Sequence, residues 1–207
     1  MELETPHGLA RVHLHPVERP AAALVLGHGA AGGVGAADLV AATEAANEVG
    51  VTVALVEQPY VVAGRRSPAP ARQLDAAWTA VVEQLRAGVF NGLAIVVGGR
   101  SAGARVACRT AAEVGAVAVV CLAFPVHPPG KGDDPTKSRL AELDAVDVPV
   151  LVVQGESDPF GIPPERAGRT VVTVPGNHSL RDTRAVREAA SHWLGDQVEG
   201  ALTSSSQ

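Results

Sequence analysis

Aromatic side chains and cysteines are scarce in this sequence of 207 residues. Phe, Trp and Tyr together make up 3% of the chain, whereas apolar residues make up 46%, so the core must be built from closely packed small side chains. The two cysteines, Cys108 and Cys121, lie inside apolar segments. This placement favours buried thiols in a reducing compartment over a disulfide scaffold.

The sequence also lacks an excess of basic residues and long apolar segments. The net charge is −5 at pH 7 and no basic stripe is present, which argues against a nucleic-acid partner. No apolar run approaches the ~20 residues that a membrane span needs. The N-terminus lacks a positively charged region followed by an apolar one, so no signal peptide is evident. We therefore expect a soluble cytoplasmic protein with neither a nucleic-acid nor a membrane partner.

Cofactor motifs are missing as well. The seven histidines show no spacing typical of metal ligands. Neither a P-loop nor a G-x-G-x-x-G dinucleotide motif is present, so we expect no metal and no organic cofactor. The length fits a single domain, which we place at residues 1–200. The polar tail at 201–207 is expected to be disordered.

Short apolar segments alternate with segments of helical periodicity along the chain. Strands are expected at 8–17, 21–27, 51–57, 93–97, 116–124, 148–153 and 170–174. Helices are expected at 37–49, 71–87, 102–114, 136–145 and 181–194. The alternation predicts an α/β fold with a doubly wound, mostly parallel sheet and helices on both faces. The first of these strands is expected at an edge of the sheet.

A G-x-S-x-G motif, Gly99-Arg100-Ser101-Ala102-Gly103, lies between a predicted strand and a predicted helix. In this context the serine is held on a sharp turn with its hydroxyl exposed above the sheet. Ser101 is therefore a candidate nucleophile, although serine is also a common helix N-cap. The neighbouring Arg100 could form a buried ion pair beneath the serine.

Two further strand ends carry the partners that a catalytic serine needs. Asp158 follows the predicted strand at 148–153, and His178 follows the one at 170–174. An imidazole can accept the serine proton, and a carboxylate on its other nitrogen fixes the tautomer and stabilises the imidazolium. In isolation Asp158 could be a turn residue, His178 could cap the last helix, and Glu156 is an alternative acid. The order Ser, Asp, His after three strands predicts a catalytic triad.

The tetrahedral intermediate of acyl transfer also needs donors for its oxyanion. The candidates are two backbone amides: that of Ala102 at the start of a predicted helix, and that of Ala30 in the glycine-rich turn after the strand at 21–27. The candidates for the rim of the pocket are His28, Arg65 and His127. Alternatively, His28 could be a structural turn residue, and Arg65 and His127 could be solvated surface residues.

The segments VVGGRSAG, LVLGHGAAGG, VVQGESDPFG and VPGNHSL resemble motifs of the α/β-hydrolase superfamily. GRRSPAPARQLDAAW and FPVHPPGK are similar to a compact dienelactone-hydrolase-like branch, which includes a testis-expressed protein and a subunit of a chromatin-associated acetyltransferase complex. The resemblance covers nearly the whole chain. It implies Ser101 as nucleophile, Asp158 as acid and His178 as base. Ala30 and Ala102 then carry over as the oxyanion donors.

The chain departs from dienelactone hydrolases proper at the nucleophile. Those enzymes place a cysteine where this chain has Ser101, so their reaction is not expected here. No cap domain is inserted after the strand at 116–124, which argues against a deep lipase-like acyl tunnel. We expect a serine hydrolase that cleaves a small carboxylic ester or thioester through an acyl-enzyme on Ser101, with an amide or lactone as a weaker option. The alternative hypothesis is a non-catalytic interaction module that keeps the fold.

Overall fold

Eight strands form one sheet, in the order β1-β2-β4-β3-β5-β6-β7-β8. The computed structural model describes residues 1–30 and 33–204. The strands are β1 (Glu2–Thr5), β2 (Gly8–His15), β3 (Ala22–Gly27), β4 (Val51–Glu57), β5 (Ala94–Arg100), β6 (Ala118–Leu122), β7 (Val150–Gly155) and β8 (Arg169–Val174). The strands from β3 to β8 run parallel, whereas β1 and β2 pair in antiparallel fashion. The expected mostly parallel sheet is confirmed.

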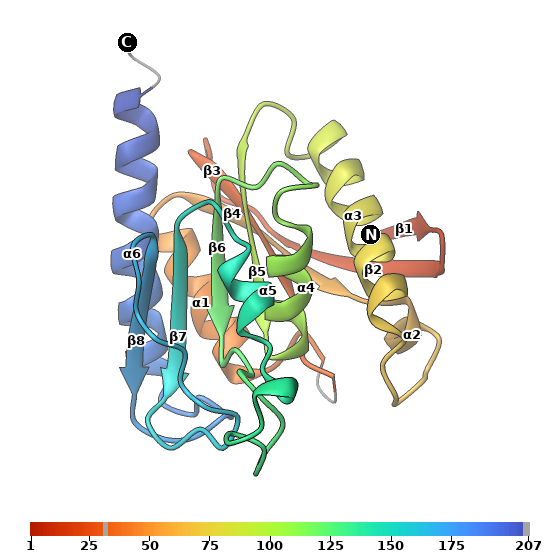
Figure 1. The fold of residues 1–207 in the computed structure, drawn as a ribbon. Coiled ribbons are helices and arrows are strands. Elements are labelled where there is room, and N and C mark those ends of the chain that lie inside the picture. Colours follow the sequence, from red (N-terminus) through yellow and green to blue (C-terminus); the bar gives the residue numbers. More distant parts are fainter. Residues whose placement is uncertain (31–32, 205–207) are drawn as a thin grey trace.

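Helices cover both faces of this sheet (Figure 1). On one face α1 (Ala37–Glu48) packs along α6 (Thr183–Ser204). The other face carries α3 (Ala71–Ala87), α4 (Ala102–Thr110) and α5 (Leu140–Asp144). A short helix, α2 (Pro59–Val62), and a 3-10 turn at Pro135–Lys137 lie in connecting segments. The sheet is thus doubly wound, as predicted.

The central strands are almost entirely apolar because both of their faces are covered, with Gln154 in β7 as the exception. Every residue of β3, β6 and β7 is buried, which is typical of parallel strands between two helical layers. One apolar cluster lies around Trp78, between the sheet and the layer of α3 and α4. The other lies around Leu39 and Leu194, between the sheet and the layer of α1 and α6.

The N-terminal end of the sheet differs from the prediction. β2 was expected at the edge, but β1 pairs outside it through a hairpin, with Glu2 opposite Arg11. The turn depends on Gly8, whose φ of 107° is accessible to glycine. β1 has four residues, exposed or only partly buried. Such a short strand has no apolar pattern that could reveal it in the sequence.

Two helical segments also differ in length from the prediction. The segment 136–145 was expected to be one helix, but α5 covers only Leu140–Asp144 after the 3-10 turn. α6 continues to Ser204, ten residues beyond the expected end. Residues 201–204 belong to α6 and residues 205–207 lie outside the described residues. The domain boundary at 200 and the disorder of the tail stay predictions. Among the residues described, no helix has the length and apolar character needed to cross a membrane.

The strand order reverses between β3 and β5, which lie side by side. The chain leaves β3 through α1 toward β4 on one side, and leaves β5 through α4 toward β6 on the other. Ligands of doubly wound sheets bind outside the carboxyl ends of the strands at such a switch point. The turns after β3 and β5 are therefore where a site is expected.

Candidate active site

Ser101 joins β5 directly to α4 in a strained backbone conformation. Its φ is 51° and its ψ is −108°, a region that costs a residue other than glycine about 1–3 kcal/mol. The Ser101 amide donates to the carbonyl of Leu122 at 2.9 Å, which ties the turn to β6. The Ser101 side chain makes no capping bond to α4. Ser101 therefore occupies the N-cap position of α4 without capping the helix through its side chain, and its hydroxyl is available to another partner.

The glycines around Ser101 allow α4 to begin against the end of β3. A Cβ atom on Gly99 would lie 2.5 Å from the carbonyl oxygen of Gly27, and one on Gly103 would collide with the same oxygen. No larger residue fits at either position, because the colliding atom belongs to the backbone. The motif therefore fixes the elbow, the sharp turn at residues 99–103 that carries Ser101, through close packing as well as through the conformation of the serine.

His178 accepts the hydrogen bond of the serine hydroxyl. The Nε2 atom of His178 lies 2.9 Å from Oγ of Ser101, and its Nδ1 atom lies 2.8 Å from Oδ2 of Asp158. With Asp158 as a carboxylate, Nδ1 carries the proton and Nε2 is free to accept one. The three residues follow β5, β7 and β8. The structure brings the three predicted residues together in one chain of hydrogen bonds.

The carboxyl group of Asp158 is held by three donors. Oδ2 accepts from His178 and also from Nε2 of Gln154 at 2.7 Å, and Oδ1 accepts from the amide of Phe160 at 2.9 Å. The bond to Phe160 closes a tight turn, so the turn role weighed for Asp158 is also present. Glu156, the alternative acid, is exposed at the surface. The side chain that contacts the imidazole is that of Asp158.

Two supporting residues were not identified from the sequence. Gln154 is fully buried at the end of β7, and its amide also donates toward the carbonyls of Phe124 and Gly161. The ring of Phe160 lies 4.1 Å from that of His178, centroid to centroid. A glutamine inside an otherwise apolar strand is a signal that could have indicated Gln154. Phe160 carries no such signal, because its contact with His178 is set by tertiary structure.

His178 does not cap the last helix. Asp182 does so instead, because its Oδ1 atom accepts from the amide of Ala185 at 3.1 Å in the first turn of α6. The base therefore lies in the connecting segment 175–182, which contains neither helix nor strand.

Arg100 forms the ion pair that the sequence suggested. Its Nε atom lies 2.8 Å from Oδ2 of Asp38, at the start of α1. The Asp38 side chain is 1% exposed and that of Arg100 is 19% exposed. The pair thus lies behind the elbow and joins it to a helix on the other face of the sheet.

The turn after β3 is tied to the start of α2. The Tyr60 hydroxyl donates to the carbonyl of Ala30 at 3.1 Å. His28 donates from Nδ1 to the carbonyl of Gly29 at 2.7 Å, and its Nε2 accepts from the amide of Gln58 at 3.1 Å. Burial lowers the pKa of His28, which keeps the ring neutral for both bonds. His28 is 3% exposed and lines a small hollow together with Ala102.

The remaining predicted residues lie around this end of the sheet. Ala102 is the first residue of α4, so its amide has no acceptor within the helix. Arg65 is exposed and lines a hollow of about 70 Å³ beside Tyr60. His127 is half-buried, and its amide donates to the carbonyl of Phe160 at 3.1 Å. The oxyanion roles of Ala30 and Ala102 and the rim roles of His28, Arg65 and His127 stay predictions.

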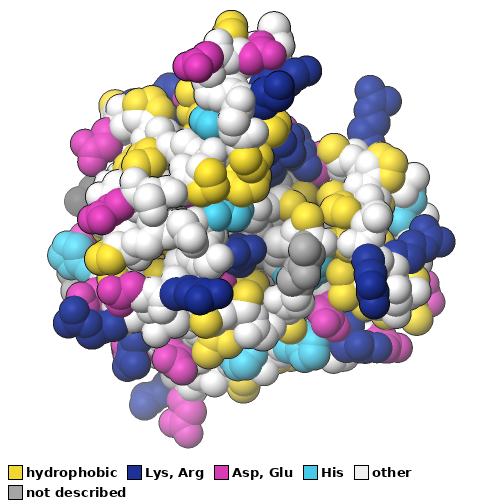
Figure 2. All heavy atoms as spheres, turned by 90° about the horizontal axis from the view of Figure 1, so that it is seen from below, with side chains coloured by type: hydrophobic (Ala, Val, Ile, Leu, Met, Phe, Trp, Pro, Cys, Tyr) yellow, Lys and Arg dark blue, Asp and Glu magenta, His cyan; other side chains and the backbone are white. Residues whose placement is uncertain are grey.

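Figure 2 shows the face toward which the arrowheads of β6, β7 and β8 point in Figure 1. Charged side chains of both signs, histidines and apolar side chains are mixed over this face, and no single charge dominates it. Within the described part of the chain, no group of three or more His, Cys, Asp or Glu side chains is placed to hold a metal ion.

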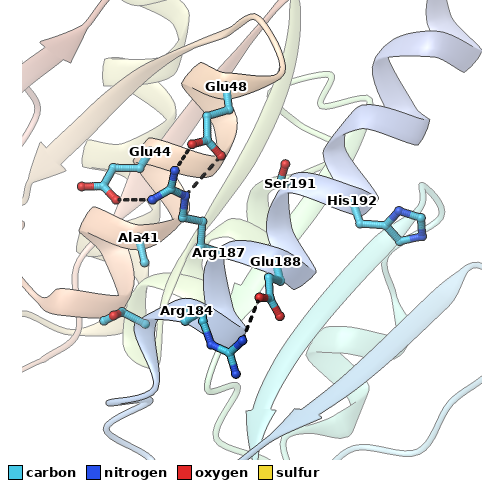
Figure 3. Close-up of a pocket in the computed structure, with 9 residues that line it drawn as sticks. Ala41, Glu44, Glu48, Arg184, Arg187, Glu188, Ser191 and His192 are labelled. Atoms are coloured by element: carbon cyan, nitrogen blue, oxygen red, sulfur yellow. Dashed lines mark hydrogen bonds and ion pairs between the residues drawn. The ribbon is translucent and has the colours of Figure 1, made fainter.

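A groove of about 590 Å³ lies elsewhere, between α1 and α6 (Figure 3). Its charged side chains pair with one another: Arg187 with Glu44 and Glu48, and Arg184 with Glu188. None of the triad residues lines this groove. We therefore assign the candidate site to the strand ends and not to this larger hollow.

Comparisons with known proteins agree on the fold. Residues 20–197 match the family model described as Alpha/beta hydrolase domain. No match was found among curated protein sequences. A solved structure from Xanthomonas campestris, XC6422, described as a serine hydrolase without lid, is 22% identical with a TM-score of 0.76. The alignment covers 93% of this chain and 91% of that one.

Two further solved structures are similar. Est1E from Butyrivibrio proteoclasticus, with ferulic acid bound, is 19% identical with a TM-score of 0.75, and the alignment covers 96% of this chain and 99% of that one. A dienelactone hydrolase from Anabaena variabilis is 17% identical with a TM-score of 0.71, and the alignment covers 93% and 94%. At these identities the likeness concerns the fold, and the predicted fold class is confirmed.

Proposed function

This chain belongs to the Alpha/beta hydrolase domain family, and from this premise we propose that it is a serine hydrolase with Ser101 as nucleophile. The observation that carries the proposal is the continuous chain of hydrogen bonds from Ser101 through His178 to Asp158, at 2.9 Å and 2.8 Å. A serine hydroxyl is a weak nucleophile, and a neutral imidazole within hydrogen-bond distance is the group that activates it.

In the first half of the reaction Oγ of Ser101 attacks the carbonyl carbon of the substrate. Nε2 of His178 accepts the hydroxyl proton, and Asp158 stabilises the imidazolium that forms. The carbonyl oxygen becomes an oxyanion, which the amides of Ala30 and Ala102 bind at the ends of two neighbouring strands. The intermediate then collapses, and the leaving alkoxide or thiolate takes the proton from His178. The acyl group remains on Ser101 as an ester.

In the second half a water molecule attacks the acyl-enzyme. His178 accepts a proton from the water, and the oxyanion forms again in the same place. Collapse breaks the bond between the acyl carbon and Oγ of Ser101, and the proton returns to the serine. The carboxylic acid is then released, and the enzyme is restored.

The favoured substrates are small carboxylic esters and thioesters. Residues 123–134, all described, connect β6 to the 3-10 turn without a helical cap, which supports an open site over a deep acyl tunnel. The ferulic acid bound by Est1E supports adding ferulate esters to the substrate panel. The panel therefore contains activated esters, thioesters and lactones of short acids together with ferulate esters.

The burial of the two cysteines supports a cytoplasmic location. Cys108 and Cys121 are buried and unlinked, with their Sγ atoms 3.5 Å apart. The bond to Cys108 and burial raise the pKa of Cys121 well above its usual value. A protonated, buried thiol is unreactive, and cysteines that serve as buried thiols in the core are typical of a reducing compartment.

Labelling with a fluorophosphonate probe tests the nucleophile. Wild type and Ser191→Ala, a control serine on α6, should be phosphonylated once, whereas Ser101→Ala should not react. We also expect the Ser101→Ala variant to lose ester hydrolysis by about 10³-fold or more. Equal labelling of wild type and Ser101→Ala would exclude this nucleophile. An absence of any acyl-enzyme across the whole panel would favour a non-catalytic interaction module.

A further inference from the structure

Arg100, the residue before the nucleophile, connects a buried carboxylate to the backbone of the catalytic base. Its Nε donates to Asp38 at 2.8 Å, and its Nη2 donates to the backbone carbonyl of His178 at 3.1 Å. We propose that the Asp38–Arg100 pair positions the segment that carries His178 against the elbow, a role that rests on the proposed function. Arg100 acts through His178 and is a positioning residue.

Asp38 gives the guanidinium a fixed anchor. The Asp38 side chain is 1% exposed, and its Oδ1 accepts from the amide of Leu39 at 2.9 Å in the first turn of α1. Burial raises the pKa of the Asp38 carboxyl, and the charge and hydrogen bond of Arg100 oppose this shift. A buried carboxylate needs a paired cation, so the Arg100 side chain is held in one direction and is not free to point to solvent.

The segment of His178 has little secondary structure of its own. Residues 175–182 form turns between β8 and α6, and Leu180 has a positive φ of 43°. The ring of His178 bonds to Ser101 and Asp158, but these bonds involve the side chain alone. The contact from Arg100 holds the main chain at His178. Because Arg100 is covalently joined to Ser101, one guanidinium links the position of the base to that of the nucleophile.

The same guanidinium lies against the turn after β3. A Cβ atom built on Gly29 would be 2.9 Å from Nη1 of Arg100 and 3.6 Å from Cβ of Ser101. Gly29 directly precedes Ala30, the proposed oxyanion donor. Three parts of the site therefore meet at Arg100: the elbow, the base segment and the oxyanion turn.

Lysine is a poor substitute at this position. The guanidinium donates from Nε and Nη2 in two fixed directions, toward Asp38 and toward His178. An ammonium group is a point charge on a flexible chain and can reach one acceptor without aligning to both. Arg100→Lys should therefore retain the charge and the fold but only part of the positioning.

The test uses Arg100→Met, Arg100→Lys and Asp38→Asn in the full chain, with Arg109→Met as the matched control. Arg109 lies on α4, has a side chain 20% exposed, and pairs with Asp75 and Glu142, away from the triad. Three quantities are measured: the rate of fluorophosphonate labelling, kcat and KM with the best ester of the panel, and the thermal unfolding midpoint.

We expect Arg100→Met to lower both the labelling rate and kcat by about 10- to 100-fold, because a displacement of about 1 Å at a reacting group is enough for such a loss. KM should stay within about twofold, since no substrate contact is removed. The labelling rates and kcat values of Arg100→Lys and Asp38→Asn should lie between those of wild type and Arg100→Met. Arg109→Met should lower the unfolding midpoint but leave labelling and kcat within about twofold.

Other results would overturn the proposal. Rates for Arg100→Met and Arg109→Met that agree within twofold would show that Arg100 serves stability alone. A change confined to KM would assign Arg100 to substrate binding. If Arg100→Met does not fold, Arg100→Lys provides the test. A wild-type kcat in Arg100→Lys would contradict the positioning role of the two guanidinium donors. An unlabelled wild type overturns the proposed function together with this inference, whereas a labelled wild type with unaffected variants removes the inference alone.

Discussion

The carboxyl end of the sheet and the groove between α1 and α6 contain the same kinds of side chain in different settings. In the groove Arg187 pairs with Glu44 and Glu48, and these side chains are 46%, 55% and 42% exposed. At the strand ends the side chain of Asp158 is fully buried and that of His178 is 16% exposed. The charged side chains of the groove pair with one another in contact with water.

The difference shows that burial and backbone strain, and not the number of charged groups, distinguish the site. An ion pair in water is screened and contributes little, whereas a buried acceptor must keep its donors. Positive φ values at residues other than glycine also occur beyond three strand ends: Ser101 follows β5, Ala123 follows β6 and Leu180 lies beyond β8, whereas Arg19 lies before β3. Strain of this kind persists only where the surrounding structure holds it.

The largest effect is expected from Asp158→Asn. The carboxylate accepts from His178, Gln154 and the amide of Phe160 through two oxygens, whereas asparagine offers one acceptor oxygen and an NH2 group. One of the three donors must then face the NH2 group, so the imidazole loses the acceptor that fixes the tautomer presenting Nε2 to Ser101. We expect kcat to fall by about 10³- to 10⁴-fold, with KM nearly unchanged. The measurement is steady-state hydrolysis of an activated ester.

Glu156→Gln is the matched control, since it removes the same charge two residues away at an exposed position. It should leave kcat within about twofold. A comparable loss in both variants would mean that overall charge, and not the buried contact with His178, carries the effect.

Much of the fold followed from the sequence because its signals are local. Continuous apolar segments such as 51–57 indicate parallel strands covered on both faces, and their alternation with helices determines the doubly wound sheet. β1 was not predicted, because a four-residue, half-exposed strand is stabilised by pairing with β2 and has no apolar pattern of its own. The end of α6 was set too early because its later turns lack the apolar pattern on which the prediction relied.

The site was predictable where each residue directly follows a strand. Ser101, Asp158 and His178 could be found because strand ends of a parallel sheet meet at one edge. Gln154 and Phe160 could not be assigned, since their roles depend on which atoms of Asp158 and His178 they touch. The near-complete burial of His28 could not be predicted, because the sequence shows a turn but not which side of that turn is buried.

A smaller effect, on stability and its pH dependence, is expected at His28. Burial lowers the pKa of His28 below its ordinary value of 6.5. As the pH falls below 6.5, His28 therefore takes up a proton in the unfolded chain while it stays neutral in the folded chain. The folded state loses stability between that pH and the lowered native pKa. His28→Gln should show a shallower loss of unfolding free energy between about pH 6.5 and pH 5 than wild type.

Chemical denaturation across this pH range measures the slope. The control is His192→Gln, because the side chain of His192 is 86% exposed on α6. That variant should keep the wild-type slope. An unchanged slope in His28→Gln would contradict a neutral, buried imidazole in the turn after β3.

The smallest effect is expected from Arg187→Met in the groove between α1 and α6. Its partners are exposed carboxylates, so the variant should lower the thermal unfolding midpoint by less than about 2 °C at low salt. The difference should shrink as the salt concentration rises toward about 0.5 M, because exposed charges are increasingly screened. Ester hydrolysis should not change, because no triad residue lines the groove. A fall in kcat without a fall in stability would couple the groove to the strand ends, and the two regions would then have to be treated as one site.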